Sequence, residues 1–162
     1  MTVRQAVVDD AEQIAAIWNP MIRDTAVTFN PTPKTADDVS AMISTRVGAG
    51  RAFIVALEVR QIIGFATYDQ FRRGDGYANT MEHTIILAPF AQGRGAGRAM
   101  MGAIEDHARK NGAHSMIAGV SSENVAGISF HQRLGYRQIA VLPEVGHRFG
   151  RWMDLHLMQK LL

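Results

Sequence analysis

The chain has 162 residues, the length of one ordinary domain, and 47% of them are apolar while 20% are charged. These values exclude a disordered or collagen-like chain. The net charge of only +2 gives no support for a nucleic-acid partner, and the lack of cysteine excludes disulfides, a thiolate nucleophile and cysteine-bound metals. No apolar run approaches the ~18 residues that span a bilayer, and no signal-peptide core is visible, so we expect a cytoplasmic protein without a membrane partner.

The first half of the chain alternates between extended and helical patterns. After a short predicted strand at Thr2–Ala6, the spacing of Asp9 and Glu12 predicts a capped helix. A loop with two prolines, Asp24–Lys34, leads to a second helix that begins after Thr35. Three strands are predicted next, with a hairpin between the first two and a glycine-containing break before the third: Ala52–Leu57, Ile62–Phe71 and Thr80–Leu87.

The second half begins with a glycine-rich turn and a helix that ends near Gly112. A buried strand, a helix and two closing strands are then predicted at Met116–Val120, Val125–Leu134, Tyr136–Leu142 and Trp152–Met158. A loop around Gly146 and Gly150 separates the last two strands. Strands grouped between helices predict an α/β fold in which one mixed sheet is covered by helices on both faces, within a single domain over residues 1–162.

The turn Gln92–Arg98, with the sequence Gln-Gly-Arg-Gly-Ala-Gly-Arg, lies between a predicted strand and a predicted helix. Closely spaced glycines allow successive backbone N–H groups to converge, and the helix adds the partial positive charge of its first turn. Such a turn can bind phosphate or pyrophosphate, to which Arg94 and Arg98 add positive charge. The alternative is a tight connection between strand and helix without a ligand.

Two other phosphate-binding motifs do not fit this turn. A P-loop ends in Gly-Lys-Ser/Thr, whereas this turn continues Gly97-Arg98-Ala99 and has no hydroxyl for magnesium. A dinucleotide-binding fingerprint requires a third glycine, where this chain has Met100, and an acid about 20 residues further on, where it has Ser115. The turn therefore favours neither ATP hydrolysis nor NAD binding.

The pattern Gln-x-x-Gly-x-Gly after a strand resembles the acetyl-CoA signature of the Gcn5-related N-acetyltransferase (GNAT) superfamily. Asn124–Tyr136 is similar to the second CoA segment of that family, which ends in Leu-Gly-Phe/Tyr. Met81–Thr84 and Val145–Leu155 resemble the subgroup that acetylates phosphinothricin, methionine sulfoximine and methionine sulfone, and the resemblance covers essentially the whole chain. It implies the GNAT fold, with a mostly antiparallel sheet and two splayed central strands, and acetyl-CoA as cosubstrate without a metal.

The resemblance also implies which residues bind the cosubstrate. The pantetheine arm would lie between the splayed strands, one ending near Leu87 and the other near Val120, like an added strand. Its partners on the first strand would be the backbone groups of Ile85, Ile86 and Leu87. The pyrophosphate would be bound by Gly93, Arg94, Gly95, Ala96, Gly97 and Arg98. Asn124 would contact the cosubstrate from the opposite side.

Acetyl transfer to an amine needs a base and a proton for the departing thiolate. We predict Glu82 as the base, because partial burial raises the pKa of a carboxyl group; alternatively, Glu82 only orients the ammonium group or pairs with an arginine. His131 stands where many members of the superfamily have a tyrosine, so it is the candidate acid; alternatively it lies on the helix surface and solvent supplies the proton. Strand alternation places His83 on the face opposite Glu82, as a hydrogen-bonded core residue.

The acceptor site is predicted from a loop, an aromatic residue and the strand that carries Glu82. Either Arg72 or Arg73, next to Gly74, could bind the α-carboxylate of an amino acid through two parallel N–H bonds, or both could be solvated loop charges. Phe29 stands where the subgroup commonly has an aromatic wall of the substrate site. By the same resemblance, His83 and Thr84 line the substrate site beside Glu82.

The leading hypothesis is an N-acetyltransferase that moves acetyl from acetyl-CoA to the α-amine of a small amino acid or analogue, by direct attack in a ternary complex. One alternative keeps this chemistry with a polyamine, an aminoglycoside or a protein N-terminus as acceptor. Another is a catalytically silent acyl-CoA-binding module, which would keep the glycine-rich turn without needing Glu82. The subgroup resemblance implies a homodimer, with Trp152–Leu162 as a candidate interface.

Overall fold

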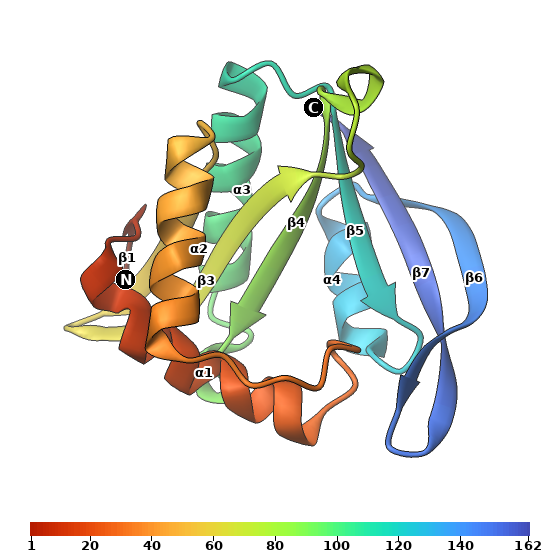
Figure 1. The fold of residues 1–162 in the computed structure, drawn as a ribbon, viewed down its shortest axis with the longest axis horizontal. Helices are drawn as coiled ribbons and strands as arrows, with labels where there is room; N and C mark the ends of the chain where they lie inside the picture. The colour runs from red at the N-terminus through yellow and green to blue at the C-terminus, as the bar shows by residue number, and fades with distance from the viewer.

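The computed structural model describes residues 1–162 and shows one sheet of seven strands with four helices (Figure 1). The strands are β1 Thr2–Gln5, β2 Phe53–Glu58, β3 Gln61–Gln70, β4 Thr80–Leu87, β5 Ser115–Ser121, β6 Arg137–Arg148 and β7 Arg151–Leu161. The helices are α1 Ala11–Asp24, α2 Ala36–Gly48, α3 Ala96–Lys110 and α4 Val125–Arg133. Short 3-10 helices lie at Val8–Asp10, Asp75–Tyr77 and Pro89–Ala91.

The sheet has the strand order β1-β2-β3-β4-β5-β7-β6. All neighbours are antiparallel except β4 and β5, which are parallel. Helices α1 and α2 cover one face through a core that includes Ile14 and Phe65, and α3 and α4 pack on the other through a core that includes Met100 and Met158. The prediction of a mixed, mostly antiparallel sheet covered on both faces is confirmed. None of the helices has the length and apolar character needed to cross a membrane.

The centre of the sheet is open. Strands β4 and β5 pair only between Thr80–Glu82 and Ser115–Ile117, yet β4 continues to Leu87 and β5 to Ser121. Figure 1 shows the two strands diverging beyond their paired ends. Backbone groups on the β5 side of β4 therefore have no strand partner after Glu82, which confirms the prediction of splayed central strands.

The C-terminal hairpin differs from the prediction. The expected loop around Gly146 is wrong, because β6 continues through Gly146 to Arg148 and turns tightly at Phe149 and Gly150, whose φ values are +52° and +72°. A register shift between Leu142 and Gly146 accommodates Pro143, which has no N–H to donate to the neighbouring strand. The hairpin is therefore longer than the sequence pattern indicates.

The helix starts confirm one prediction and correct another. Thr35 caps α2 as expected: its hydroxyl accepts from the Asp38 N–H at 3.1 Å, and the Asp38 carboxylate accepts from the Thr35 N–H at 2.8 Å. The predicted cap at Asp9 is wrong, because a 3-10 turn precedes α1. The acid that caps this 3-10 turn is Asp10. Its carboxylate accepts from the Val7 N–H at 2.9 Å and from the Arg4 guanidinium at 2.7 and 2.8 Å.

Candidate active site

The glycines of the Gln92–Arg98 turn are required for two different reasons. Gly93 and Gly95 have φ values of +74° and +86°, which residues with a side chain rarely adopt. Gly97 has no positive φ but is crowded, because a Cβ there would lie 3.0 Å from the side chains of both Leu87 and Phe130. The glycines thus allow the left-handed backbone of the turn and the close approach of Leu87 and Phe130 to the start of α3.

A cavity of about 490 Å³ lies between this turn, β4 and α4. Most residues predicted to bind acetyl-CoA line it: Ile85, Ile86, Leu87, Gly93, Gly95, Gly97, Arg98 and Asn124. Ala96 is fully buried at the start of α3 and does not line the cavity. Arg94 does not line it either, because its guanidinium lies 2.9 Å from the Glu58 carboxylate. We name this space the cofactor cavity.

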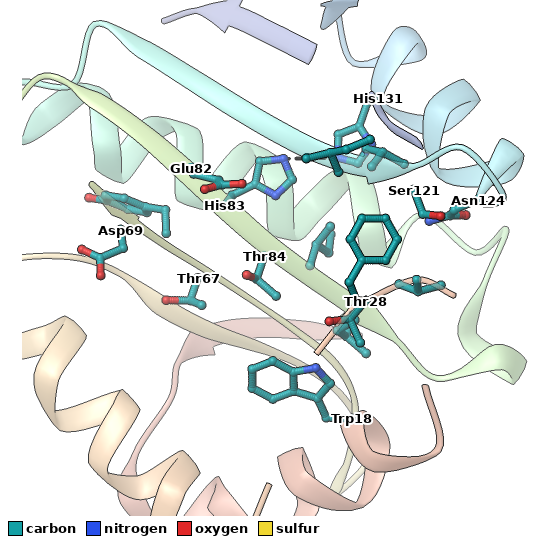
Figure 2. A pocket seen from close by; sticks show the side chains of 18 of the residues that line it. Trp18, Thr28, Thr67, Asp69, Glu82, His83, Thr84, Ser121, Asn124 and His131 are labelled. Atoms are coloured by element: carbon teal, nitrogen blue, oxygen red, sulfur yellow. Dashed lines mark hydrogen bonds between the residues drawn. The ribbon is translucent and has the colours of Figure 1, made fainter. Parts of the chain in front are cut away.

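A second cavity of about 380 Å³, which we name the acceptor cavity, lies over β3, β4 and β5. Four of the predicted substrate residues line it: Phe29, Glu82, His83 and Thr84. Both cavities share the lining residues Val27, Ile85, Ile86, Asn124 and His131. Figure 2 shows the acceptor side, with Glu82, His83 and Thr84 on one strand and His131 and Asn124 across the opening. The two cavities therefore meet at these shared residues, and Glu82 lines the acceptor cavity.

Glu82 is a carboxylate without a partner. It makes no ion pair or side-chain hydrogen bond, whereas Asp69, opposite it on β3, pairs with Arg46 at 2.5 Å and also with Arg51. The alternative that an arginine pairs with Glu82 is therefore wrong for this structure. Burial raises the pKa of the Glu82 carboxyl group. Gly119 makes room for it, because a Cβ there would lie 3.1 Å from Glu82 Oε1.

His83 and His131 form a buried pair. Their Nε2 atoms are 3.2 Å apart, and His131 Nδ1 lies 2.7 Å from the carbonyl oxygen of Gly127. Burial lowers the pKa of both imidazoles, that of His83 to about 3. The prediction of His83 as a hydrogen-bonded core residue is confirmed, and the alternative that His131 lies on the helix surface is wrong, because both side chains are buried.

The predicted carboxylate-binding loop lies outside both cavities. Arg72, Arg73 and Gly74 are exposed, and the Arg72 guanidinium lies over the Phe71 ring at 5.8 Å. The cation that lines the acceptor cavity is instead Arg46 of α2, which the sequence analysis did not identify. The available signal was Asp69, an acid at the end of an apolar strand, but its partner on α2 cannot be found from sequence spacing.

Phe29 is fixed over the acceptor cavity by the C-terminal hairpin. Its ring packs flat on Gly146, where an added Cβ would lie 2.5 Å from the ring atoms. The buried guanidinium of Arg148 donates to the carbonyl oxygen of Ile22 at 2.7 Å and to those of Thr28 and Asn30 at 3.4 Å. The loop after α1 is therefore held by β6 at the position that the sequence resemblance gives to the aromatic wall.

Residues 18–136 match the family model of the acetyltransferase (GNAT) family. The turn, the splayed strands and the two meeting cavities all lie within this matched region or contact it. The chain belongs to the GNAT acetyltransferase family, and the fold and family predicted from the sequence are confirmed.

Known relatives are similar over nearly the whole chain. An Escherichia coli L-amino acid N-acyltransferase is 38% identical, covering 98% of this chain and 92% of its own length. A Salmonella typhimurium L-methionine sulfoximine/L-methionine sulfone acetyltransferase is 36% identical, covering 98% and 93%. The structure of a Sinorhizobium meliloti phosphinothricin acetyltransferase in complex with acetyl-CoA is 30% identical, with a TM-score of 0.94, covering 99% of this chain and 88% of that one.

Proposed function

We propose that the protein transfers the acetyl group of acetyl-CoA to the α-amine of a small amino acid or analogue, of the methionine sulfoximine, methionine sulfone and phosphinothricin class. The observation that carries the proposal is that the two cavities meet and that the acceptor cavity is lined by an unpaired, half-buried carboxylate, Glu82. Amine and thioester can then be bound at the same time, as direct attack in a ternary complex requires. The names of the relatives support this class of acceptor.

The residues that line the cofactor cavity fit acetyl-CoA. No cluster of side chains in the structure could hold a metal ion. The unpaired edge of β4 offers N–H and C=O groups to the amides of pantetheine, as in strand addition. The backbone of the cavity-lining residues Gly93, Gly95, Gly97 and Arg98, at the start of α3, offers N–H groups to the diphosphate. Asn124 closes the opposite wall. When bound, acetyl-CoA supplies an activated acetyl group and a thiolate leaving group.

Glu82 acts as the base in this proposal. An amino acid arrives as an ammonium ion, and the raised pKa of the half-buried Glu82 carboxyl group narrows its difference from the pKa of the amine whose proton it must accept. His131 would need a proton on Nε2 to act as the acid, but that atom faces His83. We therefore propose that solvent protonates the thiolate, which is the second of the two sources expected from the sequence.

Arg46 is the cation placed to attract the acceptor's α-carboxylate. Arg46 and Arg51 share the single carboxylate of Asp69, so the three side chains carry a net positive charge at the cavity wall. Arg72 and Arg73 are the second candidates, but they lie outside the cavity. A bound carboxylate at Arg46 would leave the amine nearer to Glu82, since Asp69 and Glu82 are opposite each other in the β3–β4 register.

A thiol-release assay across several amines tests the function. We expect turnover with methionine sulfone, methionine sulfoximine or phosphinothricin, and little with spermidine or a peptide. Turnover of the polyamine or the peptide alone would overturn the acceptor class while keeping the acetyltransferase chemistry. Release of thiol with none of these amines, under conditions where acetyl-CoA binds, would favour the silent acyl-CoA-binding alternative.

We also propose that the protein is a cytoplasmic homodimer, built through the outer surface of β6 and β7. Large apolar side chains are exposed on these strands: Ile139, Val141, Leu142, Val145 and Trp152. The cysteine-free composition suits a reducing compartment. Sedimentation should give a dimer for the unaltered chain and a monomer for Trp152→Glu, and a monomeric unaltered chain would contradict the proposal.

A further inference from the structure

The opening between β4 and β5 is bridged by a pair of imidazoles. Backbone pairing ends at Glu82 and Ile117, and the next residue on β4 is His83. Its Nε2 lies 3.2 Å from Nε2 of His131 on α4, the helix that follows β5 and carries one wall of the cofactor cavity. This is the one side-chain hydrogen bond in the structure that joins β4 to α4. It lies immediately beyond the point where the sheet opens.

Hydrogen-bond partners define where the protons of the pair lie. The Gly127 carbonyl can only accept, so His131 Nδ1, at 2.7 Å, carries a proton. In neutral His131 the other nitrogen, Nε2, is then a lone pair, and His83 must donate to it from its own Nε2–H. His83 Nδ1 is consequently an unprotonated acceptor, and it is the atom of the pair that is buried without a partner.

The groups around the pair favour its neutral form. Tyr136 stands edge-on to both imidazoles, with ring centroids at 5.7 Å from His83 and 5.4 Å from His131. Behind it, Glu105 of α3 accepts from the Tyr136 hydroxyl at 3.0 Å and from Lys160 Nζ at 2.6 Å, so its charge is compensated. Glu82, the neighbour of His83 on β4, points to the opposite face. No carboxylate contacts either imidazole, and burial lowers the pKa of His131 more than the charge of Glu105 raises it.

The pair is connected by hydrogen bonds to a cofactor-cavity residue, Asn124, which is the N-cap of α4. His131 holds the carbonyl of Gly127, and the N–H of Gly127 donates to Asn124 Oδ1 at 2.9 Å. The Asn124 side chain fits tightly there, because a Cβ on Gly127 would lie 2.3 Å from Asn124 Nδ2. Hydrogen bonds thus run from His83 through His131 and Gly127 to Asn124, which lines both cavities.

We propose that His83 is a positioning residue for acetyl-CoA binding: its Nε2–H fixes His131 as the Nδ1–H tautomer and, through Gly127, fixes Asn124 at the wall of the cofactor cavity. The proposal rests on the proposed acetyl-CoA site but not on the identity of the acceptor. It gives the buried histidine of β4 a role in cosubstrate affinity rather than in proton transfer.

Two variants of similar length separate this role from simple packing. His83→Gln keeps an N–H donor near the position of Nε2, whereas His83→Met fills the space without a donor. Calorimetric titration with acetyl-CoA should show about tenfold weaker binding for His83→Met, the usual cost of leaving one buried hydrogen-bonding group unsatisfied. His83→Gln should bind within about twofold of the unaltered protein. Equal affinity of His83→Met and the unaltered protein would overturn the proposal.

Nitrogen-15 chemical shifts of the unaltered full chain give a second readout that does not depend on how the variants fold. His131 should show a protonated Nδ1 and an unprotonated Nε2, and this pattern should persist to lower pH than in an ordinary histidine, because burial lowers the pKa of His131. A protonated Nε2 on His131 would overturn the proposal. If the expected tautomer is seen but the unaltered protein does not bind acetyl-CoA, the proposed function is wrong. The assignment of the hydrogen bonds between His83 and His131 would still hold.

Discussion

The two cavities that meet at the active site are built from different parts of the chain. The cofactor cavity is bounded by two stretches that offer backbone groups: a continuous glycine-rich turn, Gln92–Arg98, and the unpaired edge of one strand. The acceptor cavity is mostly side chains from segments far apart in sequence, among them Phe29, Arg46, Glu82 and Leu155. The cofactor cavity therefore depends on backbone conformation, and the acceptor cavity depends on which side chains the fold brings together.

This difference predicts how each side responds to substitution. On the cofactor side, adding bulk should matter at least as much as replacing one polar side chain, because backbone N–H groups and empty space contribute to the binding. On the acceptor side, removing one functional group should change chemistry or specificity directly, because no neighbour duplicates it.

Glu82→Gln should lower kcat by about 10²- to 10⁴-fold, the usual contribution of a general base. Because burial raises the pKa of Glu82, the unaltered enzyme should lose activity as pH falls through that raised pKa, where the carboxylate becomes protonated. The variant should lack this limb and recover part of its activity at alkaline pH, where more amine arrives deprotonated. Initial rates measured from about pH 5.5 to about pH 9.5 report both effects.

Glu12→Gln is the matched control, since Glu12 is an exposed acid on α1. It should leave kcat and the pH profile unchanged. Unchanged turnover in Glu82→Gln would remove Glu82 from the mechanism. A fall in turnover with an unaltered pH profile would assign Glu82 to orienting the ammonium group, the alternative that the sequence leaves open.

Arg46→Gln should raise the KM for the amino acid acceptor by about ten- to a hundredfold, the range expected when a charged hydrogen bond is lost. The KM for acetyl-CoA should change little, since Arg46 does not line the cofactor cavity. Arg72→Gln is the comparison, and it should have little effect because Arg72 lies outside the acceptor cavity. A higher KM for the acceptor in Arg72→Gln, with no change in Arg46→Gln, would instead assign the carboxylate site to the loop of Arg72, Arg73 and Gly74.

Most residues that the sequence assigns to the cofactor side line one cavity, because that side contains a continuous motif. A contiguous motif such as Gln92–Arg98 carries its own geometry, because glycines at fixed spacing define the turn. Arg46 and Asp69 could not be predicted in the same way, because their contact depends on how α2 packs on β3. Likewise, the buried pair of His83 and His131 joins residues 48 positions apart. The strand pattern indicated that His83 is buried but not what it binds.

Gly97→Ala should weaken acetyl-CoA binding by about tenfold and destabilise the fold by about 1 to 3 kcal/mol, because the new methyl group would lie 3.0 Å from both Leu87 and Phe130. Gly102→Ala is a matched control in the same helix, with nothing within 4 Å of the added Cβ. It should stabilise the fold by about 0.5 to 1 kcal/mol and leave binding unchanged. Calorimetry and urea unfolding measure the two quantities, and similar losses in both variants would contradict the crowding argument.

The smallest expected effect lies outside both cavities and provides the baseline for the contrast. The hydrogen bond from Arg4 lowers the pKa of Asp10, so this pair stabilises the fold above the unfolded pKa of ~3.9 and the contribution is lost as pH falls toward the folded pKa. Asp10→Asn should therefore lower the free energy of unfolding by about 1 kcal/mol at neutral pH, a value reduced by the solvent that reaches Arg4, whose side chain is 39% exposed.

The difference between Asp10→Asn and the unaltered protein should shrink as the pH of the urea titration is lowered below ~4, where the carboxyl group becomes protonated in both states. Asp106→Asn removes an exposed ion pair with Arg109 and should change stability by less than about 0.5 kcal/mol. Neither variant should alter the KM for acetyl-CoA or for the acceptor. A change in either KM would show that stability alone influences the cavities, and the effects assigned to Arg46 and Gly97 would have to be measured against that background.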